Sequence, residues 1–509
     1  MITVIKNIHN TFLNLQAQYT NWAIYGTGEG AEKLWKELEK LNLLENIKCV
    51  MDNEEKICNG LTFHGNKVKG LSELPSYIDV IFIGAEINHI IVEQKIKDFL
   101  QMVKNDKILV VNPFWTDVTF EGRLDYLKYI ESPKNQDNFV PMCDDNYQYM
   151  PGDSKVIAWF LPQFHQIELN NKYHGMGFTE WTNTSQTLPQ FKGHYQPHIP
   201  YDVGYYDLMN PQTLKRQGVL AKKYGIYGFG FFYYWFSGKR IMEKPLQMLL
   251  DHKEIDINFC VHWATDDWSM SWYGGENKVV LKQTIPVAVD FWKDIAPLFE
   301  DKRYIKIDGK PLLVIYKCNV FNRSDFIEFI RQFRKLVRQA GYPDVYVMLS
   351  TGDGTFENVD HWAGDALVEY QPWKLFQSEL IEKVLPEGYI NPNFRGNIIS
   401  LQKVLRNKAY LSDYKCKKFF RSAMVSWDNS ARKRESNAIV MLDNAPENMK
   451  QWLIDIMLES RKIHSPEENF VFLSSWNEWA EGSHLEPDYK YGYAWLQAVK
   501  EAHELCREK

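Results

Sequence analysis

Four carboxylates and two indoles are crowded into one short stretch of this 509-residue chain, SSWNEWAEGSHLEPD. Glu478 and Glu481 stand three residues apart beside Trp476 and Trp479, and Glu486 follows closely. Two carboxyl groups held together in a partly dry aromatic cleft repel each other, so one tends to keep its proton while the other stays ionised. Such a pair supplies a general acid and a general base. In the alternative interpretation, the glutamates only begin a helical turn and the indoles belong to the core.

The elements that must position this stretch follow a regular alternation. Eight apolar runs of strand length are separated, in most cases, by segments with helical periodicity. The runs are 155–164, 225–236, 257–264, 310–317, 345–350, 366–373, 421–428 and 469–479. Eight such units over roughly 350 residues predict an α/β fold, a (β/α)8 TIM-like barrel covering 154–509. The longest insertion, 166–209, is polar and aromatic, and we expect a loop that covers the barrel mouth.

The first part of the chain predicts a smaller α/β domain. Residues 1–114 alternate short apolar strands with helical segments, as in half of a doubly wound parallel (Rossmann-like) sheet, and 115–153 have the polar, irregular composition of a linker. One turn has the G-x-G-x-x-A form of a dinucleotide fingerprint, with an acid roughly 20 residues on. The matching residues are Gly26, Gly28, Gly30 and Asp52. They are the candidate cofactor-binding residues, and the alternative is that glycine only permits a tight turn.

A barrel places its active site at the carboxyl ends of its strands, where the loops converge. Acids, amides and large aromatics accumulate at these ends, with Glu478 and Glu481 as the catalytic candidates. The substrate-binding candidates are Gln163, His165, Tyr233, Tyr234, Trp235, His262, Trp263, Tyr370, Trp427, Asp428, Asn429, Trp476, Asn477, Trp479 and Glu486. Asp266 and Asp267 are rival carboxylates, with a solvated loop as their alternative. Trp159 is a further stacking candidate that can instead point into the barrel as core.

Composition excludes several classes of partner. The net charge is -6 without a long run of either sign, so electrostatics indicate neither nucleic acid nor an acidic membrane surface. Seven scattered cysteines without a CxxC pair indicate a reducing compartment. No stretch approaches ~18 uninterrupted apolar residues and the start lacks a signal-peptide core, so we expect a cytoplasmic protein without a transmembrane segment. None of His165, His174, His262, His361 and His484 shows an H-x-x-x-H or H-E-x-x-H spacing and there is no G-x-S-x-G turn, so we expect no metal and no cofactor in the catalytic chemistry.

Four segments resemble a known family. AWFLPQFHQIELNNKYHGMGFTEWTN, GFGFFYYWF, SWDNSARKR and SSWNEWAEGSHLEPD are similar to WbsX-type proteins of bacterial polysaccharide loci, whose domain resembles glycoside hydrolase family 99, the endo-α-mannosidases. The resemblance covers roughly residues 153–505 and implies a retaining mechanism. It implies that Glu478 acts as base on the sugar's own 2-hydroxyl, forming a 1,2-anhydro sugar, and that Glu481 acts as acid and then base. The chain departs from the mannosidases at Ala480, where they usually carry His, and in its N-terminal domain.

Three functions remain open at this point. The first is an enzyme acting on a mannose-like glycosidic bond of a bacterial polysaccharide or its precursor, with an oligosaccharide or polysaccharide as substrate. The second is a glycosyltransferase of O-antigen, capsule or lipopolysaccharide biosynthesis that uses a nucleotide-sugar donor, which would have to bind saturably. The third is a non-catalytic glycan-binding protein, in which Glu478→Gln would leave ligand affinity intact.

Overall fold

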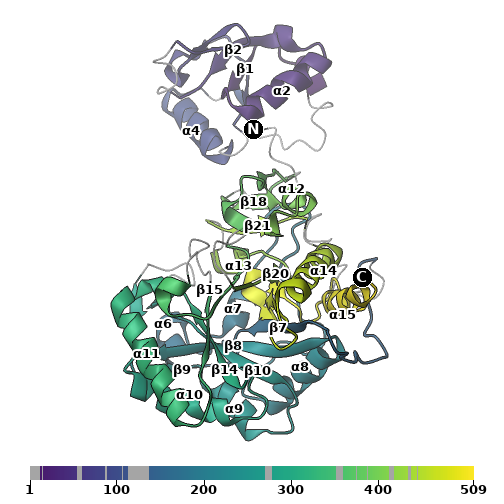
Figure 1. The fold of residues 1–509 in the computed structure, drawn as a ribbon. Helices are drawn as coiled ribbons and strands as arrows, with labels where there is room; N and C mark the ends of the chain where they lie inside the picture. The colour runs from purple at the N-terminus through teal and green to yellow at the C-terminus, as the bar shows by residue number, and fades with distance from the viewer. Residues whose placement is uncertain are drawn as a thin grey trace. The chain divides into compact units, whose positions relative to one another are not determined.

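The chain forms two compact units (Figure 1). The computed structural model describes residues 12–13, 15–53, 60–85, 89–105, 107–112, 137–269, 278–350, 359–373, 375–386, 388–391, 393–411, 418–433, 437–443 and 445–509. One unit comprises Met1–Tyr126 with two short segments, Pro189–His194 and Pro386–Phe394, and the other comprises the rest. Most of the predicted linker, 115–136, lies outside the described residues. Among the helices described, none is both long and apolar enough to cross a bilayer.

The first unit contains a six-stranded sheet in the order β3-β4-β2-β1-β5-β6. Its elements are β1 Trp22–Tyr25, α2 Glu29–Lys40, β2 Ile47–Met51, β3 Thr62–Phe63, β4 Asn66–Lys69, β5 Val80–Ile83, α4 His89–Met102 and β6 Leu109–Val111. The pairs β1–β2, β1–β5 and β5–β6 are parallel, as the alternation of strands and helices predicts. Trp22 and Ile24 enter one apolar cluster while Ala23 and Tyr25 enter another, because successive side chains of a strand point to opposite faces. Both faces of this sheet are therefore buried.

The second unit is built on the predicted ring of parallel strands. The sheet order is β19-β16-β15-β14-β10-β8-β7-β22-β20, and only Arg421 separates β19 from β20. Since β19 pairs with β16 and β20 with β22, these two pieces act as one strand that closes the ring. The strands are β7 Lys155–Phe160, β8 Ile226–Phe236, β10 Asn258–Trp263, β14 Lys310–Tyr316, β15 Tyr346–Ser350, β16 Ala366–Val368, β19 Phe419–Phe420, β20 Ser422–Met424 and β22 Phe470–Ser474. Each falls on one of the eight predicted runs except β19, which lies just before the run 421–428 that contains β20, so the TIM-like barrel is confirmed.

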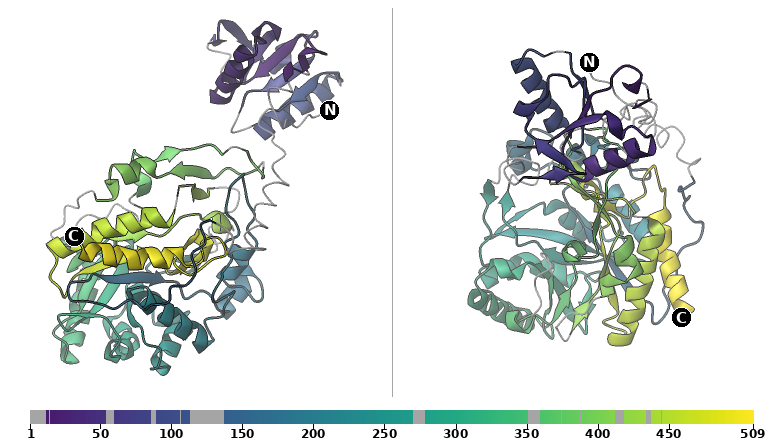
Figure 2. Two further views of the ribbon diagram at one scale, coloured as in Figure 1. Left: turned by 90° about the vertical axis from the view of Figure 1, so that its right-hand side faces the viewer. Right: turned by 90° about the horizontal axis from the view of Figure 1, so that it is seen from above.

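Helices cover the outside of the barrel (Figure 1). They include α8 Pro211–Lys223, α9 Lys244–Asp251, α10 Ala288–Glu300, α11 Arg323–Gln339, α14 Pro446–Ile463 and α15 Ala494–Arg507. Local sequence sets where several of them begin: the Asn210 side chain accepts a hydrogen bond from the backbone of Gln212 at the start of α8, and Asn322 caps α11 in the same way. α14 and α15 lie side by side in both Figure 1 and Figure 2 and contact each other.

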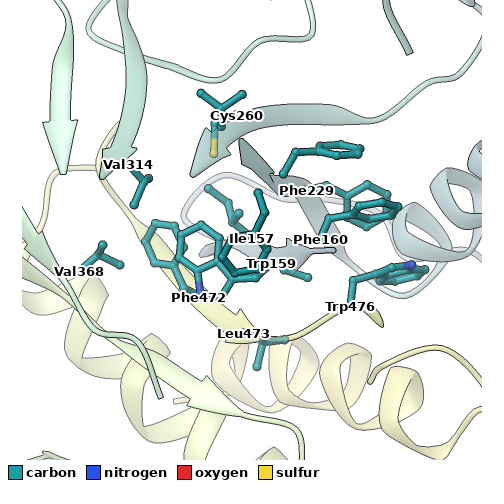
Figure 3. Close-up of a cluster of buried hydrophobic side chains, with 14 of the residues drawn as sticks. Ile157, Trp159, Phe160, Phe229, Cys260, Val314, Val368, Phe472, Leu473 and Trp476 are labelled. Carbon is teal, nitrogen blue, oxygen red and sulfur yellow. The ribbon is translucent and has the colours of Figure 1, made fainter. Parts of the chain in front are cut away.

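The barrel interior is a packed core rather than a pore (Figure 3). The Trp159 ring stacks on Phe472 with centroids 4.9 Å apart, beside the inward side chains of neighbouring strands. Gly230 on the adjacent strand makes room for this indole, since a Cβ there would lie 2.4 Å from the Trp159 ring. Trp159 is therefore core, which is the second of its two predicted interpretations.

The insertion after β7 differs from the loop that we predicted. It contains two short helices, α6 Glu168–His174 and α7 Glu180–Ser185. The Thr179 hydroxyl caps α7 by accepting a hydrogen bond from the backbone of Trp181 at 3.3 Å, and the Trp181 indole donates to the carbonyl of Tyr206 at 2.7 Å. The loop prediction was wrong for α7 because a local cap and a buried aromatic anchor stabilise a helix of six residues, which is too short to show periodicity in the sequence.

Candidate active site

A narrow cavity opens at the carboxyl ends of the barrel strands. Its volume is about 70 Å³, less than the roughly 300–1,000 Å³ of most ligand pockets, so a whole sugar ring enters only if side chains at its mouth shift. The aromatic residues lining it are Phe232, Tyr234, Trp268, Tyr316, Tyr370 and Trp373. The charged residues lining it are Asp266, Asp267, Arg432, Glu478 and Glu481. The structure thus brings both predicted catalytic glutamates to one aromatic cavity.

A small hairpin after β22 positions the two glutamates. It consists of the strands β23 Asn477–Glu478 and β24 Ser483–His484, with a short helical turn, Trp479–Glu481, between them. Gly482 closes this turn in the left-handed region, at φ 60°, where a Cβ would lie 3.0 Å from Asp428. The close approach of the two segments therefore depends on glycine.

One guanidinium holds both glutamates and a third carboxylate. Arg432 lies on the short helix α13, Ser430–Lys433, and donates to Glu481 Oε1 at 2.7 Å through Nη1 and to Glu478 Oε1 through Nη2. Its Nε donates to Glu180 Oε2 at 3.3 Å. The Arg432 and Glu180 side chains are fully buried, and those of Glu478 and Glu481 retain 6% and 17% of their exposure. Glu481 is the more accessible of the two glutamates.

This cluster favours a proton shared among its acids. Burial raises the pKa of Glu478 and of Glu481, and Arg432 opposes that rise without cancelling it. The three carboxylates bear more negative charge than the one guanidinium of Arg432 can neutralise. Because the cluster is buried away from water, ionising all three carboxylates is costly. A cluster of this kind can keep one carboxyl group protonated while another is ionised, the condition for acid and base catalysis by one site.

The loop before Arg432 positions the helix α13, which carries this arginine, and its side chains do not line the cavity. Asp428 accepts hydrogen bonds from the backbone of Ser430 at 3.0 Å and from the Gln196 side chain at 2.7 Å. Asn429 accepts one from the backbone of Ile439 at 2.8 Å. We predicted Asp428 and Asn429 as substrate contacts, but both side chains are engaged in holding α13.

Glu486 lies behind the hairpin and accepts four hydrogen bonds. The indoles of Trp476 and Trp479 donate at 3.0 and 2.7 Å, and Tyr206 and Gln217 donate at 2.9 and 2.6 Å. Burial raises the pKa of Glu486 to about 7 in spite of these donors. The structure therefore places Trp476, Trp479 and Glu486, three predicted substrate contacts, in the support beneath the glutamates.

Asn477 connects the hairpin to the first barrel strand. Its amide donates to the carbonyl of Leu161 at 3.0 Å, and its side-chain oxygen accepts from the backbone of Leu161 at 2.7 Å. Its amide also donates to Tyr206. Each polar atom of this side chain is thus used inside the protein, and Asn477 orients the hairpin that carries Glu478.

Side chains along β8 and β10 point alternately into the barrel and toward the outer helices, so some residues predicted as substrate contacts do not reach the cavity. Tyr234 lines the cavity, whereas the hydroxyl of Tyr233 donates to Asp294 on α10 at 2.5 Å. Trp235 and Trp263 pack against Phe291, also on α10, at 5.3 and 5.0 Å between ring centroids. These three residues point outward toward the helix layer, because neighbours on a strand face opposite sides of the sheet. The structure does not bring Tyr233, Trp235 or Trp263 to the cavity.

The remaining candidates surround the cavity at different depths. Gln163 donates to the Tyr234 hydroxyl at 2.9 Å, and Tyr370 lines the cavity directly. His262 packs 5.0 Å from Phe232, and burial lowers its pKa to about 3, which keeps the imidazole neutral. Two candidates are not among the lining residues: Trp427, whose ring centroid lies 6.0 Å from that of Trp373, and His165, which is fully buried.

The glycine turn of the first unit is engaged locally. Gly26 has φ 120°, and its backbone donates to the carbonyl of Met51 at 2.7 Å. The Thr27 hydroxyl donates to Asp52 at 2.5 Å, the carboxylate that was expected to meet a ribose. Gly28 and Gly30 begin α2 without a side-chain cap. A nucleotide at this turn stays a prediction.

Sequence reasoning missed two members of the cluster, Arg432 and Glu180. Both lie in segments whose resemblance to the family is evident, SARKR and TEWTN, yet neither stands out by type. The signal that could have found Arg432 is its place just beyond the strand run 421–428, since a basic residue at a strand end beside paired acids is a natural counter-ion.

Fold and site together define a class: a TIM-like barrel with paired carboxylates in an aromatic cavity at the carboxyl ends of its strands. The model of the family described as "Glycosyltransferase WbsX" matches residues 156–499, and the chain belongs to this family. The predicted relationship to WbsX-type proteins is confirmed.

Relatives and solved structures extend this comparison. The chain is 32% identical over 354 residues to WxcX proteins of two strains of Xanthomonas campestris pv. campestris, a match covering 68% of this chain and 49% of theirs. The chain thus spans about half the length of these relatives. A solved glycoside hydrolase-like protein matches with a TM-score of 0.43 and 13% identity, covering 73% of this chain and 98% of that one. An endo-alpha-mannosidase of family 99 from Bacteroides thetaiotaomicron matches with a TM-score of 0.41 and 12% identity, covering 70% and 98%.

Proposed function

We propose that the barrel acts on a glycosidic bond of a mannose-like unit in a bacterial polysaccharide or its precursor. The observation that carries this proposal is the pair Glu478 and Glu481, held by Arg432 and lining an aromatic cavity at the carboxyl ends of the strands. Sugar rings stack their C–H faces on aromatic side chains, and carboxyl groups supply the proton transfers that glycosidic bonds require. Family membership supports a glycan as the substrate.

The proposed roles are those that the resemblance to family 99 implies, and the accessibility and spacing of the two glutamates support them. Glu478, the more buried glutamate, takes the proton of the sugar's 2-hydroxyl as that oxygen attacks the anomeric carbon. Glu481, the more exposed one, gives a proton to the leaving oxygen as its bond breaks, leaving a 1,2-anhydro sugar. Glu481 then takes a proton from water as the water oxygen attacks, and Glu478 returns its proton to the 2-oxygen. Glutamates on one turn reach the same side of a sugar, which favours participation of the 2-hydroxyl over direct attack by a carboxylate.

Transfer from a nucleotide-sugar is the second candidate, and the description of the family favours it. The charge of the cavity weighs against it. Among the described residues, the cavity lining contains four carboxylates and one guanidinium, that of Arg432, and Lys317 pairs with one of the four, Asp266, at 3.3 Å, so the negative charges still outnumber the positive ones. A diphosphate in this place would meet like charge, whereas a neutral glycan would not.

Product analysis separates these functions. The protein is incubated with α-mannosides and mannose-containing bacterial glycans, with and without nucleotide-sugars, and the products are identified by mass spectrometry. We expect hydrolysis, or transfer between glycans, that needs no nucleotide-sugar and is lost in Glu481→Gln. Glu459→Gln is a matched control, because Glu459 binds a buried arginine, Arg421, that does not line the cavity. Extension only with a nucleotide-sugar would establish the second candidate, and binding without turnover would indicate a non-catalytic protein.

A further inference from the structure

A second cluster of possible ligand atoms lies beside the hairpin that carries the glutamates. It comprises His198 from the insertion after β7, and His484 and Asp488 from the C-terminal segment, all three buried. One nitrogen or oxygen atom of each lies within 4.8 Å of the corresponding atoms of the other two. None of the three lines the cavity, and none takes part in the chemistry proposed above.

The backbone holds these residues together independently of their side chains. The amide of Tyr201 donates to the carbonyl of Pro487 at 2.8 Å, and the amide of Tyr489 donates to the carbonyl of Ile199 at 3.0 Å. This short antiparallel pairing aligns the segment that follows His198 with the segment around Asp488. The cluster is therefore organised before any ligand binds. Such preorganisation lowers the entropic cost of binding and so favours high affinity.

Hydrogen bonding determines the tautomer of His484. Its Nδ1 lies 2.9 Å from the carbonyl oxygen of Glu486, and a carbonyl can only accept, so Nδ1 carries the hydrogen. Nε2 therefore presents a lone pair. That atom is 2.8 Å from Nδ1 of His198 and 3.7 Å from Oδ2 of Asp488. Histidines that bind metals commonly donate their second ring N–H to a backbone carbonyl in this way.

Asp488 has one oxygen engaged and one available. Oδ1 accepts hydrogen bonds from the amides of Lys490 at 2.9 Å and Tyr491 at 2.6 Å, which fixes the carboxylate. Oδ2 is buried and has no hydrogen-bond partner among the described residues; the Tyr195 hydroxyl approaches Asp488, but outside hydrogen-bonding geometry. A hydrogen bond from His198 to His484 would satisfy the imidazoles and still leave Oδ2 facing a lone pair. A cation satisfies all three groups at once.

We propose that His198, His484 and Asp488 bind one Zn²⁺ ion. Two imidazoles and one carboxylate are typical zinc donors, and ligand atoms around tetrahedral zinc lie ~3.3 Å apart for bonds of about 2.0–2.1 Å, between the two spacings found here. Zinc also binds nitrogen donors more tightly than Mn²⁺ or Fe²⁺ does. The ion joins the insertion after β7 to the catalytic hairpin. Because the His484 ring stacks on Trp479 with centroids 3.7 Å apart, the ion positions the turn that ends at Glu481.

Metal analysis of the full chain tests this proposal and does not depend on the function proposed for the cavity. The protein is stripped with a chelator, dialysed against Zn²⁺, and its zinc content and thermal midpoint are measured. We expect one zinc per chain, a higher midpoint with zinc, and the visible absorption of a tetrahedral site after loading with Co²⁺. An unchanged midpoint together with no retained zinc would overturn the proposal.

Two variants locate the ion. Asp488→Asn keeps the acceptor for the two backbone amides but removes the charge, and His198→Gln removes a ligand from the other segment. Each is expected to lose zinc affinity at least ~100-fold. His252→Ala is the matched control, since His252 pairs with a carboxylate, Glu254, at 2.9 Å on the surface, and it should keep the wild-type zinc content. Wild-type zinc content in both ligand variants would overturn the proposal; if one variant does not fold, the other decides.

Discussion

Replacing Arg432 tests how the acidic cluster is balanced. Arg432→Met keeps most of the side-chain volume and leaves three carboxylates, Glu180, Glu478 and Glu481, without their shared cation. Removing one partner of a buried ion pair costs about 3–5 kcal/mol, because the other partner remains buried and uncompensated. Here three partners lose the same cation, so we expect a loss of unfolding free energy at the upper end of that range.

The loss should depend on pH with a definite sign. Burial already raises the pKa of Glu478 and of Glu481. Arg432 lowers both pKa values, so its removal should raise them further. A carboxyl group whose pKa is higher in the folded than in the unfolded chain contributes stability that is fully present below about 4.3 and is lost as pH rises through the folded value. Arg432→Met should therefore be destabilised more at pH 8 than at pH 5.

Urea unfolding at both pH values, followed by tryptophan fluorescence, measures this effect. Midpoints are compared, since a chain with two compact units need not unfold in one step. Arg421→Met serves as the matched control, because Arg421 is also buried and bound to two glutamates, Glu369 and Glu459, but does not line the cavity. By the same reasoning it should also lose more stability at pH 8 than at pH 5, because Glu369 stays buried without its cation, so it measures what a single buried arginine pair outside the cavity contributes. A midpoint for Arg432→Met equal to that of the wild type at both pH values would refute the reasoning.

Three further predictions concern single side chains. Tyr234→Phe removes the acceptor of the Gln163 amide in the cavity and should raise the KM for a glycan, whereas Tyr233→Phe loses only its bond to Asp294 and should leave KM unchanged; equal effects in steady-state kinetics would contradict the inward and outward assignment. Gly230→Ala places a Cβ 2.4 Å from the Trp159 ring and should cost about 1–3 kcal/mol, seen as a lower thermal midpoint. Burial opposes ionisation of Asp153, but hydrogen bonds from Arg507 and Tyr147 lower its pKa to about 2, so its stabilisation is present above about 3.9 and is lost as pH falls toward 2. Asp153→Asn should therefore flatten the fall of the unfolding midpoint between pH 4 and pH 2, and an unchanged slope would contradict this.

The barrel could be predicted because its strands are buried on both faces. Parallel strands of this kind appear as continuous apolar runs, and β7, β8, β10 and β14 all coincide with such runs. The division of one strand at Arg421 could not be predicted, since it depends on a buried arginine reaching Glu369 from 52 residues away. The helices of the insertion were also missed, because they depend on tertiary anchors rather than on their own periodicity.

The sequence was sufficient to predict the two glutamates of the site, but not the arginine, Arg432, that neutralises part of their charge. Glu478 and Glu481 are recognisable because they follow the last strand together with indoles. Arg432 and Glu180 are 252 residues apart in the chain, and only the closed ring brings them together. Successive side chains of a strand point to opposite faces of the sheet. Applied to the sequence, this rule would have assigned Tyr233 and Tyr234 to opposite faces, with only one of them at the cavity.

The dependence on the leaving group tests the roles of Glu478 and Glu481 most directly. If Glu481 protonates the leaving oxygen, the first turnover of Glu481→Gln, followed as phenol release, should stay near the wild-type rate on an α-mannoside with a strongly acidic phenol, which needs no protonation. The first turnover should be lost on a substrate with an alkyl leaving group. Glu478→Gln should be equally impaired on both, because its base acts on the sugar itself. The same loss on both substrates for Glu481→Gln, or full activity of Glu478→Gln on either, would contradict the account.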